Sequence, residues 1–414
     1  MLDDQNESSV ERIYWRNVIA MIISWTVWIP FQSACWIYFQ AFLKELHITP
    51  FQIALISFTG TITLALMRIP GGYLTDKVGR RKIIIILTYI VVFDYLIYAY
   101  ASNFQVVLIA TLISSLALLY QPALSAIVAD SLPKTKRGKG YLLVNTLTSL
   151  ASIASPLIAL WALEIFNGNI LSAQRYLYIL AFGSGMIAAI VRTILLQETL
   201  ARNKIDAIRE PFREILSGYF DVSKFVVRKL RNIIILNLII SFTLGLTYLS
   251  QYYTLYYLLV PPDIWSIAVL VSNITFFIIS FPLGFLTDKI GRRIPLVFGT
   301  ISVSIQLWLM ALAPIGKAIP FLYTWSIIGA VGWAVSSIVI PAIEADLLPI
   351  EIRGRAYAIL SLFWDFSFAF SQIIGGFLYE NYGARIPFLV ASIMVVPSIY
   401  FSITIKETLK LKKE

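Results

Sequence analysis

Three charged residues stand inside long apolar stretches of the sequence: Arg68, Asp94 and Asp365. A charge inside the hydrocarbon region of a bilayer is expensive, and such groups commonly bind substrates or ions or carry protons. We expect Asp365 to be a carboxylate that takes up and releases a proton. For Asp94, a static structural partner explains the charge at least as well. Arg192 and Glu164 lie near the ends of apolar stretches, where long side chains can extend to the membrane interface.

Polar and aromatic residues near the middle of other apolar stretches form a second candidate group. Aromatic faces beside amide groups suit a sugar or another partly apolar solute. Interfacial aromatic belts and interhelical hydrogen bonds are the alternative explanation. The candidates for shaping a substrate cavity are Trp28, Gln32, Gln121, Gln251, Tyr252, Trp333 and Gln372.

The chain has one cysteine, Cys35, and one histidine, His47, so its sequence offers no Cys/His metal cluster. No G-x-S-x-G element accompanies His47, and no G-x-x-x-x-G-K-[ST] loop is present. These absences argue against an enzyme and against ATP-driven transport. We expect no cofactor and no metal.

The elements that must position these residues are membrane-spanning helices. Of the 414 residues, 58% are hydrophobic and 14% are charged, against about 25% charged in soluble domains. This composition excludes a soluble enzyme, a nucleic-acid-binding protein and a disordered regulator. A spanning helix needs about 20 mostly apolar residues. Twelve stretches qualify, over residues 17–43, 50–75, 83–101, 105–130, 139–165, 175–197, 231–260, 263–286, 294–314, 320–347, 355–380 and 385–405.

The basic residues set the orientation of these helices. If both termini are cytoplasmic, 27 of the 33 lysines and arginines fall on the cytoplasmic side and four on the other side, as the positive-inside rule requires. The net charge of +10 is therefore a topology signal and does not indicate nucleic acid. We expect an all-α protein of the cell membrane, monomeric, with the lipid bilayer as its surroundings.

The two halves of the chain repeat three motifs in the same order at nearly constant spacing. This duplication predicts an N-terminal six-helix bundle (1–200), a cytoplasmic linker with short amphipathic helices (201–230) and a C-terminal six-helix bundle (231–414). Parallel repeats of this kind place a substrate site near the membrane midplane between the halves. The matched segments are 72–81 with 284–293, 129–138 with 345–354, and 197–200 with 406–409.

At these residues the chain resembles the major facilitator superfamily over essentially its whole length. The G-x-L-x-D-x-x-G-R-R loop is similar to that superfamily's signature between helices 2 and 3, and it recurs between helices 8 and 9. The acid-x6-Arg-Gly pattern at Asp130 and Asp346 resembles its sugar-porter branch, although aspartate replaces the usual glutamate. The resemblance implies twelve helices in two six-helix repeats and transport of a small molecule by alternating access.

The repeated charges lie where the helices reach the cytoplasmic surface, and glycine at 79 and 291 permits the tight turns there. The resemblance implies that these charged groups latch the halves together in the outward-open form. The alternative is that they only end helices and set topology. The latch would consist of Asp76, Gly79, Arg80, Asp130, Arg137 and Glu198, with Asp288, Gly291, Arg292, Asp346, Arg353 and Glu407 opposite.

The function predicted is proton-coupled secondary transport of a small organic solute, with uptake of a sugar-like compound as the first candidate. A proton-coupled drug exporter is the alternative, although the glycine-rich G-P-x-x-G-G element of such exporters is reduced to its proline, Pro156. A transporter-like solute sensor is a more distant alternative. We also expect Arg68 and Asp365, at similar depth on helices 2 and 11, to approach each other when the cytoplasmic side is closed. A static pair between Arg68 and Asp94 is the rival arrangement.

Overall fold

The apolar stretches of the sequence form helices throughout the described chain. The computed structural model describes residues 2–132, 137–199, 212–349 and 352–409, and these contain helices and no strands. Among them, eleven helices are long and apolar enough to cross a membrane, and the bent pair 231–246 and 250–257 makes a twelfth span. The predicted all-α architecture with twelve spans is confirmed.

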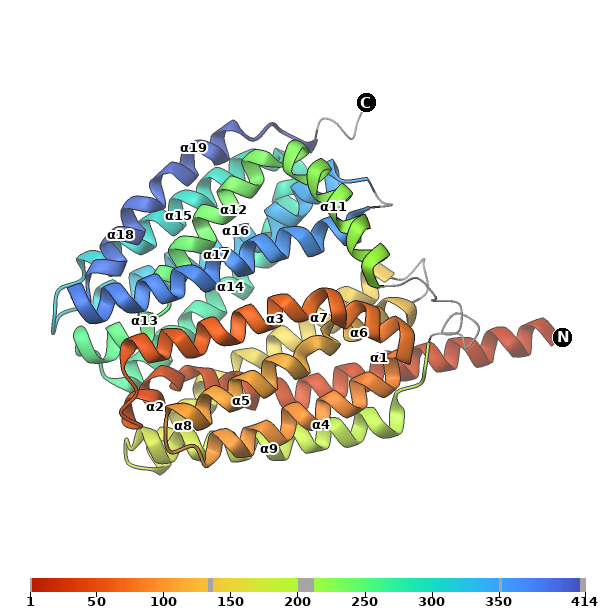
Figure 1. The fold of residues 1–414 in the computed structure, drawn as a ribbon, viewed down its shortest axis with the longest axis horizontal. Coiled ribbons are helices and arrows are strands. Elements are labelled where there is room, and N and C mark those ends of the chain that lie inside the picture. Colours follow the sequence, from red (N-terminus) through yellow and green to blue (C-terminus); the bar gives the residue numbers. More distant parts are fainter. Residues whose placement is uncertain (1, 133–136, 200–211, 350–351, 410–414) are drawn as a thin grey trace. The chain divides into compact units, whose positions relative to one another are not determined.

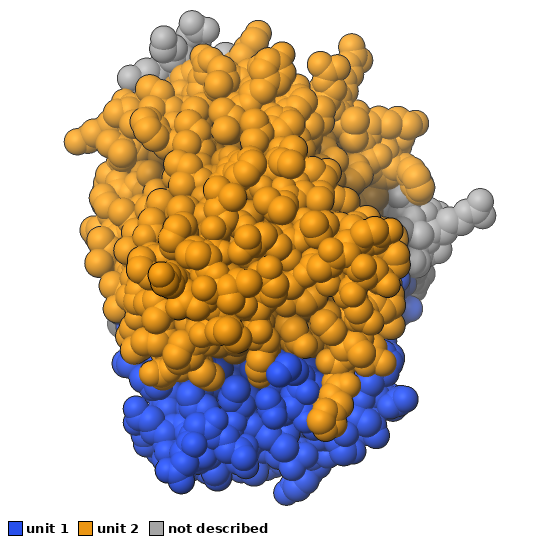
Figure 2. Space-filling model, turned by 90° about the vertical axis from the view of Figure 1, so that its left-hand side faces the viewer, with its two compact units in different colours: residues 1–46, 66–211 blue, residues 47–65, 212–414 orange. Residues whose placement is uncertain are grey.

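The chain divides into two compact units, which Figure 2 colours separately. Unit 1 comprises residues 1–46 and 66–211, and unit 2 comprises residues 47–65 and 212–414. The division at residues 65 and 66 falls inside one continuous helix, α3 (Pro50–Val78). Helix α3 therefore contributes its first part to unit 2 and its last part to unit 1.

Unit 1 is a helical bundle, drawn in red to yellow-green in Figure 1. Besides the end of α3 it contains α1 (Leu2–Ile37), α2 (Phe39–Glu45), α4 (Arg80–Ala99), α5 (Phe104–Ala117), η1 (Leu118–Tyr120), α6 (Gln121–Asp130), α7 (Arg137–Ile153), α8 (Ser155–Ile165) and α9 (Ile170–Leu195). Both α1 and α4 pack against α9, and α1 also packs against α7 and α8. Apolar side chains such as Met21, Ile84 and Ile127 fill the core between these helices.

Unit 2 repeats this bundle after an additional helix (Figure 1). Its elements are α11 (Phe212–Lys229), α12 (Arg231–Leu246), α13 (Ser250–Tyr252), the π-helical turn η2 (Tyr253–Tyr257), α14 (Pro262–Ile290), α15 (Arg293–Leu312), α16 (Ile319–Leu347), α17 (Arg353–Tyr382), α18 (Ile386–Met394) and α19 (Val396–Thr404). Helix α12 packs against α17, and α16 packs against both α14 and α15. Of the predicted linker, the part that the structure describes forms α11.

Several predicted spans are interrupted. Helices α7 and α8 meet at Ala154, just before Pro156, because proline lacks an amide hydrogen and clashes with the preceding turn. The sequence predicts one helix over 231–260, but the chain bends by 43° between residues 246 and 250. Gly245 precedes this bend and lies against α17, where a Cβ atom would stand 1.8 Å from the Ser371 hydroxyl oxygen. Close packing on α17 therefore accompanies the break.

The first repeated motif, 72–81 and 284–293, lies at the turns from α3 to α4 and from α14 to α15. We call the end of each unit that carries these turns the motif end, and the opposite end the far end. Helices α4 and α15 begin at the motif end and finish at the far end. The orientation of these ends relative to the cytoplasm stays a prediction.

Candidate functional site

Glycine makes both motif-end turns possible. Gly79 has φ 97° and Gly291 has φ 96°, a backbone region that side chains other than glycine rarely adopt. At Gly291 a side chain would also displace the Glu407 carboxylate, because a Cβ atom would lie 2.3 Å from one of its oxygens. The glycine turns predicted from the sequence are therefore confirmed.

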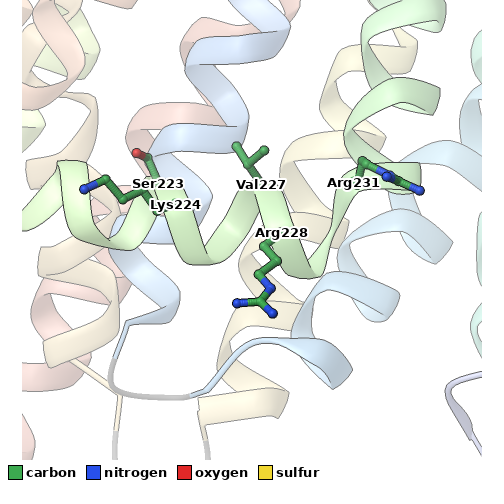
Figure 3. A pocket seen from close by; sticks show the side chains of 5 residues that line it. All are labelled: Ser223, Lys224, Val227, Arg228 and Arg231. Carbon is green, nitrogen blue, oxygen red and sulfur yellow. The ribbon is translucent and has the colours of Figure 1, made fainter.

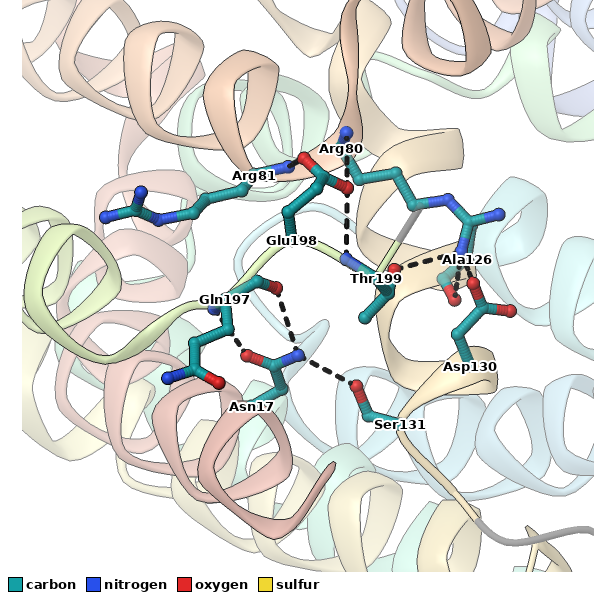
Figure 4. A network of polar contacts seen from close by, with 9 residues as sticks. All are labelled: Asn17, Arg80, Arg81, Ala126, Asp130, Ser131, Gln197, Glu198 and Thr199. Atoms are coloured by element: carbon teal, nitrogen blue, oxygen red, sulfur yellow. Dashed lines mark hydrogen bonds and ion pairs between the residues drawn. The ribbon is translucent and has the colours of Figure 1, made fainter. Parts of the chain in front are cut away.

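The glutamate of the repeated Glu-Thr motif caps the helix that follows each turn. The Glu198 carboxylate accepts the backbone N–H groups of Arg80 at 3.2 Å and Arg81 at 3.0 Å (Figure 4). In unit 2, Glu407 accepts those of Arg292 at 2.9 Å and Arg293 at 3.1 Å. The first amide groups of a helix lack partners inside it, and the positive end of the helix dipole attracts a negative charge.

The cap also determines the charge state of Glu407. Partial burial raises the pKa of this carboxyl, but the backbone N–H groups of Arg292, Leu409, Arg293 and Thr408 together outweigh burial. The net effect is a pKa below its ordinary value, because these donors stabilise the charged form. Glu407 is thus an ionised cap at neutral pH.

The first arginine of each pair forms a salt bridge within its own unit. Arg80 pairs with Asp130 and also donates to the Thr199 hydroxyl at 3.3 Å (Figure 4). Arg292 pairs with Asp288 at 3.0 Å and with Asp346 at 3.5 Å.

The other predicted latch residues have different roles or lie outside the described part. Arg353 donates to two backbone carbonyls at the end of α16, those of Ala345 at 2.7 Å and Leu348 at 3.1 Å. A cationic side chain is stabilised at a helix C-terminus, where backbone carbonyls lack partners and the helix dipole is negative. The side chains of Asp76 and Arg137 lie outside the described residues. A latch between the halves stays a prediction.

An asparagine that was not predicted from the sequence joins α1, near the start of its membrane span, to the end of α9. Asn17 is fully buried, and its amide nitrogen donates to the Ser131 hydroxyl and the Gln197 carbonyl, each at 3.1 Å. Its amide oxygen accepts the Gln197 N–H at 2.7 Å (Figure 4). In unit 2, Asn232 donates to the Thr404 hydroxyl at 3.2 Å. The two asparagines are 215 residues apart, so the repeat spacing is a signal that could have identified them.

The far ends repeat a contact as well. Arg175 donates to the Ala101 carbonyl at 3.2 Å, just after α4, and Arg385 donates to the Ala313 carbonyl at 2.7 Å, just after α15. Each arginine thus binds the carbonyl end of the helix whose amide end a glutamate caps. Both helices are fixed at their two ends by charged side chains.

Both predicted coupling carboxylates are buried in the spans. Asp94 on α4 is 3% exposed and Asp365 on α17 is 8% exposed. Oδ1 of Asp94 has no hydrogen-bond partner within the described part of the chain, and no salt bridge there includes Asp94. The static Arg68–Asp94 pair considered from the sequence is therefore not formed. Arg68 lies on α3, partly buried.

The expectation that Arg192 extends to the membrane interface is wrong. Its side chain is fully buried in unit 1, where Nε donates to the Ser24 hydroxyl at 3.1 Å and Nη1 to the Thr88 hydroxyl at 2.8 Å. Its guanidinium carbon lies 5.6 Å from the centre of the Trp28 ring. The error has a physical reason: the side chain lies on the inner face of α9, where α1 and α4 enclose it. Glu164, by contrast, is exposed.

Glu344 is a buried carboxylate that the sequence analysis passed over. It lies on α16 at 6% exposure, and the Asn237 amide on α12 donates to it at 3.4 Å. In the sequence it stands two residues before Asp346 of the repeated motif. Glu344 adds a third buried carboxylate to Asp94 and Asp365.

The predicted cavity residues occupy varied places. Trp28 is a core residue of unit 1 and meets Tyr95 edge to face at 6.3 Å. Gln251 is buried, Gln32 and Tyr252 are partly buried, and Gln121 and Trp333 are exposed. Tyr252 lies against Tyr379 of α17, with ring centres 5.7 Å apart.

Gln372 links α17 to the first part of α3. Its amide nitrogen donates to the Ser57 hydroxyl at 2.8 Å, and Thr61 donates to its amide oxygen at 3.5 Å. One turn further on, Gly376 allows Ala54 to approach so closely that a Cβ atom would meet it at 2.4 Å. Glu380 accepts the N–H of Phe51 at 2.8 Å. These contacts explain why residues 47–65 belong to unit 2.

Comparison with known proteins places these features in a family. The sequence profile of the Major Facilitator Superfamily matches residues 18–262 and 260–413. The uncharacterized MFS-type transporter YhjO of Bacillus subtilis is 21% identical over 334 residues, which is 80% of this chain and 78% of YhjO. The quinolone resistance protein NorA of Staphylococcus aureus is 22% identical over 221 residues. That match spans about half the length of NorA, 52% of each chain.

Solved structures share the fold. The nucleoside transporter NupG superposes with a TM-score of 0.71 at 14% identity and covers 95% of this chain and 100% of its own. A D-xylose-proton symporter superposes with a TM-score of 0.69 at 13% identity, covering 96% of this chain and 98% of its own. At such identities the likeness establishes the architecture and leaves the substrate open.

Proposed function

Because the chain belongs to the Major Facilitator Superfamily, we propose that it moves a small organic solute by alternating access and couples this movement to protons. The protein is a multi-pass membrane transporter and not an enzyme. Alternating access requires the two repeats to expose a shared substrate site to one side of the membrane at a time.

Proton coupling rests on one observation above all, the burial of Asp94 in a membrane span without a salt bridge among the described residues. A permanently ionised carboxylate in this place would be costly. A carboxylate that gains a proton in one state and releases it in another avoids that cost for part of the cycle. Asp365, which is buried on α17, is a second candidate for gaining and releasing a proton.

Transport by reconstituted protein tests this proposal. Proteoliposomes carrying the wild type should accumulate one member of a panel of sugars, nucleosides and amphipathic organic compounds when a pH gradient is imposed. We expect Asp94→Asn to lower gradient-driven accumulation at least tenfold while leaving solute exchange without a gradient intact. Asp263→Asn, which neutralises an exposed carboxylate at the start of α14, is the matched control. Unchanged pH dependence in both Asp94→Asn and Asp365→Asn would exclude proton coupling through either group.

Export is a second candidate because NorA, a relative by sequence, is a quinolone resistance protein. The same vesicles distinguish the two directions. If the solute accumulates in the vesicles while protons also move inward, the protein is a symporter, as uptake requires. If the solute accumulates while protons move outward, the protein is an antiporter, as export requires.

The motif-end charges are proposed to stabilise one conformational state, as the latch predicted from the sequence would. The salt bridges of Arg80 and Arg292 and the caps from Glu198 and Glu407 support this role by holding the short turns in place. Turnover of Asp76→Asn at constant surface expression tests it. We expect reduced turnover, and unchanged turnover would leave these residues a purely topological role.

A further inference from the structure

Helix α11 presents a row of basic side chains at the entrance to a membrane span. Val222, Val226 and Leu230, spaced four residues apart, are buried in the core of unit 2, where α11 packs against α17 and α12. This contact fixes the rotation of the helix. The opposite side is exposed and carries Lys224 and Arg228, one turn apart (Figure 3).

These cations line a pocket with a volume of about 480 Å³. Its wall is formed by Ser223, Lys224, Val227, Arg228 and Arg231 (Figure 3). Lys224 and Arg228 lie one turn apart on α11, and Arg231 follows just after the end of that helix. Within the described part of the chain, no salt bridge involves any of them. The pocket thus has three cationic donors, a hydroxyl and no acidic lining residue.

Apolar surface accompanies these charges. Val227 lines the pocket and is 43% exposed, and Phe220, one turn before Lys224, is 71% exposed. Arg231 is the first residue of α12, the helix that begins the seventh span, so the pocket lies at the level where a span enters the membrane. A ligand with an anionic head and an apolar tail would match both the charges and the exposed apolar side chains.

We propose that this pocket binds the phosphate headgroup of an anionic phospholipid, with the acyl chains lying along the exposed apolar side chains of α11. Phosphate oxygens accept charge-assisted hydrogen bonds from lysine and arginine, and basic groups at the cytoplasmic surface of membrane proteins attract anionic lipids. A soluble phosphate would use the same cations but would gain nothing from Phe220 and Val227. Topology alone explains an excess of cations on this side, but not their grouping around one pocket. The proposal does not depend on which solute is transported.

Native mass spectrometry of the full-length protein in neutral detergent tests the proposal. The delipidated protein is titrated with phosphatidylglycerol, phosphatidylcholine or inorganic phosphate. We expect one phosphatidylglycerol to bind with at least tenfold higher affinity than phosphatidylcholine. The combined change Lys224→Gln, Arg228→Gln and Arg231→Gln should abolish this preference.

The matched control removes three exposed cations elsewhere on the motif end, by Lys77→Gln, Lys82→Gln and Lys289→Gln, and should retain the preference. If the triple pocket variant does not yield monodisperse protein, Arg228→Gln alone should weaken phosphatidylglycerol binding several-fold. Equal loss in the control would overturn the proposal, because it would indicate a nonspecific charge effect. Inorganic phosphate that displaces the lipid at equal concentration would also overturn it, in favour of a soluble anion.

Discussion

At the motif ends, Arg80 of unit 1 and Arg292 of unit 2 occupy equivalent places but meet different surroundings. The side chain of Asp130, which pairs with Arg80, is 37% exposed, whereas that of Asp346, which pairs with Arg292, is 12% exposed. Arg292 has a second acidic partner in Asp288. The two units thus share the arginine–aspartate salt bridge but expose it to water to different degrees. The stability of unit 2, whose pair is shielded, should therefore depend more on both partners being present.

The interiors of the units differ more than their ends. Arg192 is buried in unit 1, and the equivalent residue of unit 2, at the repeat spacing of 209 residues, is Phe401. Glu344 is buried in unit 2, and the equivalent residue of unit 1, at the repeat spacing of 216 residues, is Val128. Capping and turn residues match between the repeats, whereas these buried ionisable groups do not. The shared residues therefore maintain the bundle, and the unshared charges are where we expect the roles of the two units to diverge.

The largest effect on stability should come from breaking the shielded pair. Arg292→Ala leaves Asp346 poorly solvated and without its cation, which we expect to cost about 2–3 kcal/mol, somewhat less than for a fully buried pair. Arg80→Ala leaves the more exposed Asp130 in contact with water, and we expect a cost of about 1 kcal/mol or less. Chemical unfolding of the purified variants, followed by tryptophan fluorescence, measures both. The double variant Arg292→Ala/Asp346→Ala should recover part of the loss, and equal costs for the two single variants would refute the proposed difference.

The next effect concerns the turn that only glycine fits. Gly291→Ala forces a side chain into a region of positive φ and against the Glu407 carboxylate, which we expect to cost about 2 kcal/mol. Gly316→Ala is the matched control, because Gly316 also has positive φ, 71°, but a Cβ atom there would meet nothing within 4 Å. It should cost about 1 kcal/mol. The difference in unfolding free energy between the two variants measures the collision of the new side chain with Glu407. Identical costs would show that this collision does not contribute.

The sequence predicted those features that depend on local pattern. Long apolar stretches gave the twelve spans, and repeated motifs gave the turns at Gly79 and Gly291. The burial of Arg192 was missed because it depends on which faces of α1, α4 and α9 meet, and spacing along one helix does not determine that. Trp28 was predicted to line a cavity but is a core residue of unit 1. An aromatic residue in the middle of a span can face either a solute or the core, and its position in the sequence does not distinguish the two. The assignment of residues 47–65 to unit 2 depends on contacts with α17 that no local pattern encodes.

A smaller difference is expected between the two asparagines that tie the first helix of each repeat to the last. Asn17→Ala removes three hydrogen bonds and leaves the Gln197 N–H without its acceptor, at a cost of about 1–2 kcal/mol. Asn232→Ala removes the bond to Thr404 and should cost about 0.5–1 kcal/mol. Unfolding measurements on both variants, with Asn381→Ala as an exposed-site control, check this order. A larger cost at Asn232 would show that the hydrogen bonds do not determine it.

The smallest effect is a pH dependence that belongs to the Glu407 cap. Because backbone donors lower the pKa of this carboxyl, the ionised cap stabilises the fold fully above the unfolded-state pKa of about 4.3. The stabilisation is lost as pH falls from that value through the lower folded-state pKa. The stability difference between wild type and Glu407→Gln should therefore stay constant from about pH 8 to pH 5 and shrink below about pH 4. Glu164→Gln, which removes an exposed carboxylate distant in sequence from α15, controls for general acid effects. A difference that persisted undiminished to about pH 3 would mean that the charge of Glu407 contributes nothing to the cap and that hydrogen-bond geometry alone maintains it.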